Sequence, residues 1–287
     1  MTRRPLIALA LGCGFMVCAL FAQKPFRQFP SWEPYELPLP TDYKQSGEWV
    51  FARLMYPTTH LQMDWQSEYR RGFDWRLGNT NWSIDYPRSD RHLALAVRRL
   101  TRLQTRSVEQ TINLEDDDDV YNYPWLYAAE TGHWEMTQQQ IAKFREFLLR
   151  GGFFMCDDFH GDDEWMVFMM TMEKVFPDRK VVDIPKEDPI FHSVYDLDDK
   201  YQVPGAQFLR TRSSCEKCAT SFPPGQGGSV AHWRGIYDDH GRLMVAICHN
   251  MDLGDSWEHA DDPYYPQPFS ALGLRIGVNY VVYALTH

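Results

Sequence analysis

The sequence predicts an α/β domain in which a flavodoxin-like parallel sheet has helices on both faces and carries an added β-hairpin. Short apolar runs alternate with segments of helical periodicity, a pattern typical of a parallel sheet crossed by helices. The run Phe153–Cys156 is apolar throughout, as expected of a strand buried on both faces. Two other runs flank the turn sequence at residues 238–241, which predicts the hairpin.

Apolar runs bounded by turn residues predict the strands. In chain order the predicted strands are residues 49–55, 107–114, 123–129, 153–156, 181–184, 230–237 and 243–249. Residues 58–89 are rich in Trp, Asn, Asp and Gly and show no clean period. We therefore expect them to form a long loop over one face of the sheet.

Apolar residues at helical spacing predict four helices. The predicted helices are residues 90–104, 137–150, 163–176 and 269–285. Asp90 and Asp163 are candidate N-caps, and Thr137 forms a predicted capping box with Gln140. The last helix is apolar on nearly every side, so we expect it to be buried. A membrane span is the alternative, disfavoured by its length and by Arg275.

The chain is predicted to begin with a signal peptide at residues 1–22, in which Arg3 and Arg4 precede an apolar run. An extended lead-in at residues 23–48 and a single α/β domain at residues 49–287 follow. A retained membrane anchor is the alternative, disfavoured because the run is shorter than the ~20 residues of a spanning helix. We therefore expect a periplasmic or secreted protein, bound to a membrane only if the signal is retained.

Charge and composition exclude several protein classes. The formal net charge of −10 disfavours a nucleic-acid partner. The 44% hydrophobic and 24% charged residues exclude a disordered chain, a collagen and a multi-span membrane protein. The GxSxG, HExxH, P-loop and GxGxxG motifs are absent from the sequence. The expected partner is a small molecule or a protein of the cell envelope.

Four cysteines remain after the predicted signal peptide: Cys156, Cys215, Cys218 and Cys248. Export permits disulfides, and four thiols allow three complete pairings, which stay open. The Cys215-x-x-Cys218 motif predicts either a tight disulfide or two free thiols in a surface loop. A zinc site formed by Cys215, Cys218, His232 and His249 is the alternative.

Ligands of open α/β sheets bind beyond the carboxyl ends of the strands, and one such end is rich in polar residues here. Asp157, Asp158 and His160 follow the run Phe153–Cys156 directly. Adjacent strand residues face opposite ways, so only one of the two carboxylates can point into a given cleft. We predict Asp158 and His160 as the catalytic residues and Asp157 as a ligand-binding residue.

Two further strand ends carry candidate ligand-binding residues. Thr131, Gly132 and His133 follow the third strand, where backbone N–H groups could meet an oxyanion or a hydroxyl. The segment at residues 249–259 supplies the other candidates: Asn250, Asp252 and Trp257. Its oxygen ligands suit Ca²⁺, although the spacing is not that of an EF-hand. A divalent metal is thus a candidate cofactor, with Asp158, His160 and Asp252 as candidate ligands.

Three segments of the chain carry a fairly specific combination of motifs: residues 123–127 (YPWLY), 147–161 (FLLRGGFFMCDDFHG) and 275–280 (RIGVNY). Together they resemble the bacterial domain of unknown function 4159, over about residues 49–287. The resemblance implies a fold similar to class I glutamine amidotransferase-like proteins of the trehalose-utilisation type. In amidotransferases the nucleophilic Cys lies at the turn after a strand. Here that turn holds Asp158 and His160, and Cys156 lies inside the strand, so the amidotransferase reaction is not implied.

Two functional hypotheses follow. In the first, the protein is an exported small-molecule hydrolase acting on a carbohydrate, with Asp158 as base or metal ligand and His160 as acid/base or ligand. Substrate contacts would come from the candidates above together with Arg275 and Asn279, and exposed indoles would stack on sugar rings: Trp75, Trp82 and Trp257. In the second, the chain is a non-catalytic ligand-binding, Ca²⁺-binding or assembly module of the cell envelope.

Overall fold

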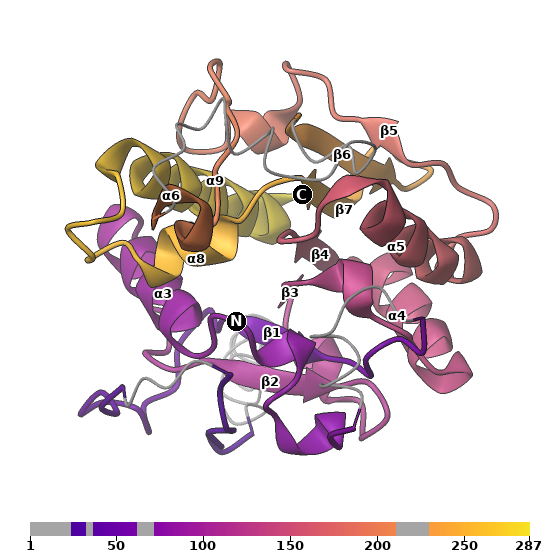
Figure 1. Cartoon of the computed structure of the whole chain (residues 1–287), viewed down its shortest axis with the longest axis horizontal. Helices are drawn as coiled ribbons and strands as arrows, with labels where there is room; N and C mark the ends of the chain where they lie inside the picture. The colour runs from indigo at the N-terminus through magenta and orange to yellow at the C-terminus, as the bar shows by residue number, and fades with distance from the viewer. Residues whose placement is uncertain (1–23, 33–36, 62–71, 211–229) are drawn as a thin grey trace, which may run out of the picture.

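A seven-stranded sheet runs through the molecule in the order β2-β1-β3-β4-β7-β6-β5 (Figure 1). The computed structural model describes residues 24–32, 37–61, 72–210 and 230–287. The strands are β1 (Ala52–Met55), β2 (Gln110–Asn113), β3 (Trp125–Ala128), β4 (Phe153–Cys156), β5 (Val182–Asp183), β6 (His232–Tyr237) and β7 (Leu243–His249). Each lies within a predicted strand segment, so the predicted α/β class is confirmed. The predicted signal peptide lies outside the described residues.

The sheet is mixed, which corrects the prediction of a parallel sheet. Strands β2, β1, β3, β4 and β7 are parallel to one another. The predicted hairpin is confirmed, because β6 pairs antiparallel with β7 after the turn at residues 238–241. Strand β5 then pairs antiparallel with β6. The hairpin occupies the edge of β7, so the short β5 extends the hairpin rather than the parallel sheet.

Helices cover both faces of the sheet, as predicted (Figure 1). The α-helices are α3 (Arg88–Leu100), α4 (Gln138–Leu149), α5 (Gly161–Val175), α6 (Ala206–Arg210), α8 (Leu253–Glu258) and α9 (Gln267–Thr286). The 3₁₀ helices are η1 (Trp75–Leu77), η2 (Asn81–Ser83), η3 (Asp119–Asn122), η4 (Thr131–His133) and η5 (Pro189–Phe191). On β4, Phe154 and Cys156 face the core under α4 and α5. Phe153 and Met155 face the opposite core, under α3, α8 and α9.

Helix α9 is a core helix, as its apolar sequence predicted. Gly273 and Gly277 allow it to approach α8 and α3 closely, because a Cβ atom at Gly277 would lie 2.6 Å from Leu93 Cδ1. A Cβ atom at Gly273 would lie 1.9 Å from Ser256 Oγ. By length and composition, α9 is also the one helix of the described ranges that could cross a membrane.

The cap predicted for the first helix is wrong. Helix α3 begins at Arg88, with Pro87 at the N-cap position. Asp90 lies in the first turn and is fully buried, where it accepts hydrogen bonds from the Arg53 guanidinium. A buried guanidinium requires a carboxylate partner, and this requirement prevails over the capping preference of Asp90.

Helix α4 begins with the predicted capping box. The Gln140 N–H donates to Thr137 Oγ1 (3.2 Å), and the Thr137 N–H donates to Gln140 Oε1 (2.9 Å). We expect Thr137→Ala to lower the free energy of unfolding by about 1 kcal/mol, because it leaves a helix N–H without its partner. Urea unfolding would measure the change, with the exposed Gln138→Ala as the control. A loss no larger than that of the control would contradict the prediction.

Cys156 and Cys248 are free and fully buried. Cys156 pairs in register with Ile247, so Cys248, one residue further along β7, points to the opposite face of the sheet. Each of the three complete disulfide pairings would use Cys156, so all three are wrong. Cys215 and Cys218 lie outside the described residues. The predicted disulfide between them, and the alternative zinc site that would use both, are therefore not described by the structure.

Candidate functional site

Polar residues from neighbouring strand ends meet at one edge of the sheet. Asp158 follows β4, and Asp252 follows β7, the next strand in the sheet. Asp85 reaches the same place from the long connection between β1 and α3. One carboxylate oxygen from each of these three residues lies within 4.8 Å of the other two. The structure thus brings together two predicted site residues and one, Asp85, that the sequence analysis missed.

The turn between β4 and α5 places Asp158 in a left-handed backbone conformation, with φ of 52°. The Asp158 N–H donates to the main-chain oxygen of Met251 (2.8 Å), which follows β7. Asn250 makes two hydrogen bonds to the same turn. Its N–H donates to the main-chain oxygen of Phe159, and its Oδ1 accepts from the Gly161 N–H. Asn250, a predicted ligand-binding residue, therefore ties the two turns together.

His160 lies beside Asp158, as the catalytic hypothesis requires. Its Nε2 atom is 3.4 Å from Asp158 Oδ1, and the two side chains are 12% and 11% exposed. Burial alone would lower the pKa of His160, but its hydrogen bond with Asp158 and the neighbouring negative charges raise the pKa above its usual value. The imidazolium form is thus favoured next to the carboxylate.

Glu164 connects His160 with His133, at the end of the neighbouring strand β3. The His160 N–H donates to Glu164 Oε2 (2.5 Å), and Glu164 Oε1 lies 3.6 Å from His133 Nε2. Burial tends to raise the pKa of Glu164, but the contact with His133 lowers it below its usual value. Glu164 was missed as a site residue, because its place in the first turn of α5 is equally explained by the helix dipole.

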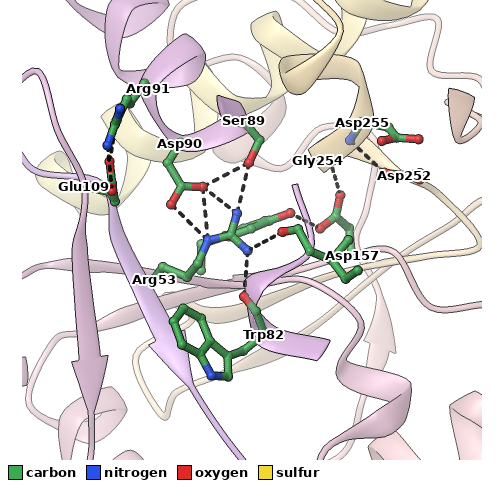
Figure 2. A network of polar contacts seen from close by, with 12 residues as sticks. Arg53, Trp82, Ser89, Asp90, Arg91, Glu109, Asp157, Asp252, Gly254 and Asp255 are labelled. Carbon is green, nitrogen blue, oxygen red and sulfur yellow. Dashed lines mark hydrogen bonds and ion pairs between the residues drawn. The ribbon is translucent and has the colours of Figure 1, made fainter. Parts of the chain in front are cut away.

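Asp157 anchors helix α8 (Figure 2). Its side chain is fully buried, and Oδ1 accepts a hydrogen bond from the Tyr127 hydroxyl (2.6 Å). Its Oδ2 accepts from the N–H groups of Leu253 (2.5 Å) and Gly254 (2.9 Å) at the start of the helix. Burial raises the pKa of Asp157 to about 7. The predicted ligand-binding role does not fit these contacts, since protein donors already surround both oxygens.

Asp252 is the N-cap of α8, where its Oδ1 accepts a hydrogen bond from the Asp255 N–H (2.8 Å). Burial, together with the charges of Asp158 and Asp255, raises the pKa of Asp252 well above its usual value. A cation would remove this repulsion. The three carboxylates of Asp85, Asp158 and Asp252 offer only oxygen ligands, which Mg²⁺ and Ca²⁺ prefer.

The Arg53 guanidinium (Figure 2) holds the backbone of the segment that leads into Asp85. This fully buried group donates to the main-chain oxygens of Trp82 (3.0 Å) and Ile84 (3.1 Å) and to the Asp90 carboxylate. Sequence reasoning missed both Asp85 and Arg53. Asp85 lies in the predicted loop of residues 58–89, which shows no clean apolar period, so no local pattern marks this residue. Arg53 did leave a signal, because it is the one charged residue in the apolar run of the first strand.

The prediction that three tryptophans are exposed is wrong. The exposed fractions of Trp75, Trp82 and Trp257 are 8%, 0% and 0%. The Trp82 indole N–H donates to the main-chain oxygen of Trp75 (2.7 Å), and the Trp257 ring packs on Tyr127. These large apolar rings fill the two cores, so the predicted ligand-binding role of Trp257 and the stacking on sugars have no structural basis.

Four other predicted ligand-binding residues contact other parts of the fold. Thr131 and Gly132 are buried in η4 against α5, where a Cβ atom at Gly132 would lie 2.5 Å from Glu164 Cβ. The Asn279 amide donates to the Tyr195 oxygen and accepts from the N–H groups of Val194 and Tyr195. Arg275 is exposed, with its guanidinium 5.7 Å from the Tyr195 ring. Arg275 and Asn279 thus contact a loop over α9.

Comparison with curated proteins found no match. A family model described as a domain of unknown function (DUF4159) matches residues 63–285. This range covers most of the chain and contains the three segments on which the resemblance rested. It also includes Asp85, Asp158, His160 and Asp252. The chain therefore belongs to the DUF4159 family.

Proposed function

We propose that this chain is an exported small-molecule hydrolase whose active site lies at the C-terminal ends of β3, β4 and β7. The observation that carries the proposal is the pairing of Asp158 with His160, 3.4 Å apart, beside the carboxylates of Asp85 and Asp252. Asp158 would take the proton from the attacking water, and His160 would protonate the leaving group. A divalent cation held by the three carboxylates would lower the pKa of that water.

The arrangement of the strands supports this place for the site. The five parallel strands follow the order of flavodoxin-like folds, in which ligands bind outside the carboxyl ends of the strands. The left-handed residue Asp158, between a buried strand and a helix, resembles the sharp strand-to-helix turn that exposes a nucleophile. We propose an amidotransferase-like fold on this basis, with a carboxylate where those enzymes carry a thiol.

The second candidate function is a non-catalytic Ca²⁺-binding or assembly module of the cell envelope. The oxygen-only ligand set of Asp85, Asp158 and Asp252 favours it, because Ca²⁺ prefers carboxylate oxygens. Such a module would bind Ca²⁺ and turn over no substrate.

For the proposed hydrolase, carbohydrates are the first substrate class to test, because the sequence resembles a family similar in fold to proteins of the trehalose-utilisation type.

We expect Asp158→Asn to lower turnover at least about 100-fold, because the amide cannot accept the proton of the attacking water. Hydrolysis of chromogenic glycosides, phosphate esters and acyl esters would be measured with Mg²⁺, Mn²⁺ or Ca²⁺ present. The melting temperature should change little, since the Asp158 side chain is partly accessible. Asp163→Asn, an exposed change in the first turn of α5, is the matched control.

Unchanged turnover in Asp158→Asn would overturn the catalytic assignment. Wild-type protein that binds Ca²⁺ but hydrolyses no member of the panel would favour the binding module. Loss of turnover in Asp163→Asn as well would indicate a general electrostatic effect instead of a role for Asp158.

A further inference from the structure

A second cluster of possible metal ligands lies at the other end of α8. Asp255 and Glu258 belong to the helix, and His259 follows it at the C-cap. Their exposed fractions are 7%, 3% and 9%. One ligand atom from each of the three residues lies within 4.8 Å of the other two. The proposed hydrolase mechanism uses none of these residues.

Helical spacing brings Asp255 to both partners, because Glu258 and His259 follow it by three and four residues. The His259 Nε2 atom lies 3.7 Å from Asp255 Oδ1 and 3.2 Å from Glu258 Oε2. The other ring nitrogen, Nδ1, lies 3.6 Å from Asp262 Oδ2. A ligating imidazole commonly has a carboxylate beside its second nitrogen, and Asp262 occupies that position here.

The charges of the cluster do not balance. His259 can supply one positive charge, whereas Asp255 and Glu258 supply two negative charges. In the part of the chain that the structure describes, the ion-pair partner of both carboxylates is His259. Arg88, on the facing helix α3, donates to the main-chain oxygen of Glu258 (2.8 Å) and pairs with Asp261. Buried negative charge without a counterion is costly, and a divalent cation would remove that cost.

A cavity of about 420 Å³ lies next to residues that contact the cluster. Its lining includes Asp262 and Tyr265, and the Tyr265 ring stacks on the His259 ring at 5.9 Å. Ala206 also lines the cavity, and its N–H donates to Asp255 Oδ2 (2.5 Å). Asp255 and His259 are thus separated from this cavity by single residues, through which water could reach a bound cation.

We propose that Asp255, Glu258 and His259 form a binding site for a divalent transition metal of the Zn²⁺ or Mn²⁺ type. One imidazole and two carboxylates are the ligand set of many zinc sites and also suit Mn²⁺, whereas Ca²⁺ takes oxygen ligands. The site is separate from the three carboxylates around Asp158. It stands whether or not the proposed hydrolase function is correct.

Calorimetric titration of the full, chelator-treated chain with Zn²⁺ and then with Mn²⁺ tests the site. We expect about one equivalent to bind at this cluster, and His259→Gln or Glu258→Gln to weaken binding at least about 100-fold. Asp262→Asn should weaken it about 10-fold, as loss of a carboxylate next to a ligating imidazole does. Bound Zn²⁺ should also raise the melting temperature of the wild type and not of His259→Gln.

Asp158→Asn is the control that separates this site from the proposed active site, and it should alter Zn²⁺ binding at the α8 cluster far less than His259→Gln or Glu258→Gln does. Glu258→Gln keeps the size of the side chain, so it serves as the test if His259→Gln does not fold. The proposal would be overturned if the wild type did not bind Zn²⁺ or Mn²⁺, or if His259→Gln and Glu258→Gln bound them as tightly as the wild type. Loss of binding in Asp158→Asn alone would place the metal at the strand ends and would also overturn it.

Discussion

Arg53→Met is expected to lower the free energy of unfolding by about 3–5 kcal/mol, the cost of removing one partner of a buried ion pair. The Arg53 side chain is fully buried, as is its partner Asp90, and their closest N–O distance is 2.5 Å. Met fills a similar volume but donates no hydrogen bond. The Asp90 carboxylate would be left buried without its cation, and two main-chain oxygens would lose their donors.

Urea unfolding at neutral pH would measure this loss, and two further variants define its origin. Arg53→Met combined with Asp90→Leu removes both charges, and we expect it to regain part of the stability. Arg98→Met is the control, since Arg98 forms an exposed ion pair with Asp42 that contributes at most about 1 kcal/mol. A loss in Arg53→Met no larger than in Arg98→Met would contradict the prediction.

The free energy of unfolding of the metal-free, chelator-treated protein is expected to fall as pH rises from about 4 to about 7, because Asp157 loses its proton. Burial raises the pKa of this carboxyl from 3.8 to about 7, so the folded protein keeps a proton that the unfolded chain releases. The resulting stabilisation is fully present below about pH 4 and is lost as pH rises through 7. A shift of this size corresponds to about 4 kcal/mol.

Asp157→Asn isolates this contribution. The amide oxygen can accept from the Leu253 and Gly254 N–H groups, and the amide nitrogen can face the Tyr127 oxygen, so the contacts remain without the charge. We expect the variant to lose less stability than the wild type between pH 4 and 7. Urea unfolding with EDTA at several pH values would measure the difference. The assignment to Asp157 would be contradicted if the free energy of unfolding changed with pH in the same way in Asp157→Asn and the wild type. It would also be contradicted if the exposed Asp163→Asn reduced the pH dependence as much as Asp157→Asn does.

Local patterns predicted the elements of this fold well. The uniformly apolar run Phe153–Cys156 became β4 at the predicted bounds, and the Thr137 capping box starts α4. The hairpin of β6 and β7 follows from its turn sequence. Helix α8, with six residues, was missed, because one and a half turns are too short to show a helical period.

The candidate site was predicted only in part. Asp158, His160 and Asp252 follow strands directly, so the rule that ligands bind beyond strand ends was sufficient to select them. The same rule selected Asp157, which instead anchors α8. It could not select Asp85, because that residue is brought to the site by a loop whose path the buried Arg53 determines.

The sequence by itself determined the α/β class, the strand and helix segments and the strand ends at which polar residues gather, because periodicity, caps and turns are properties of neighbouring residues. Only the tertiary structure decided that the sheet is mixed, that Trp75, Trp82 and Trp257 are buried, and which carboxylates meet. Those outcomes depend on contacts between segments far apart in the chain. Sheet order and the partners of buried charges such as Arg53 determine such contacts, and no local pattern encodes them.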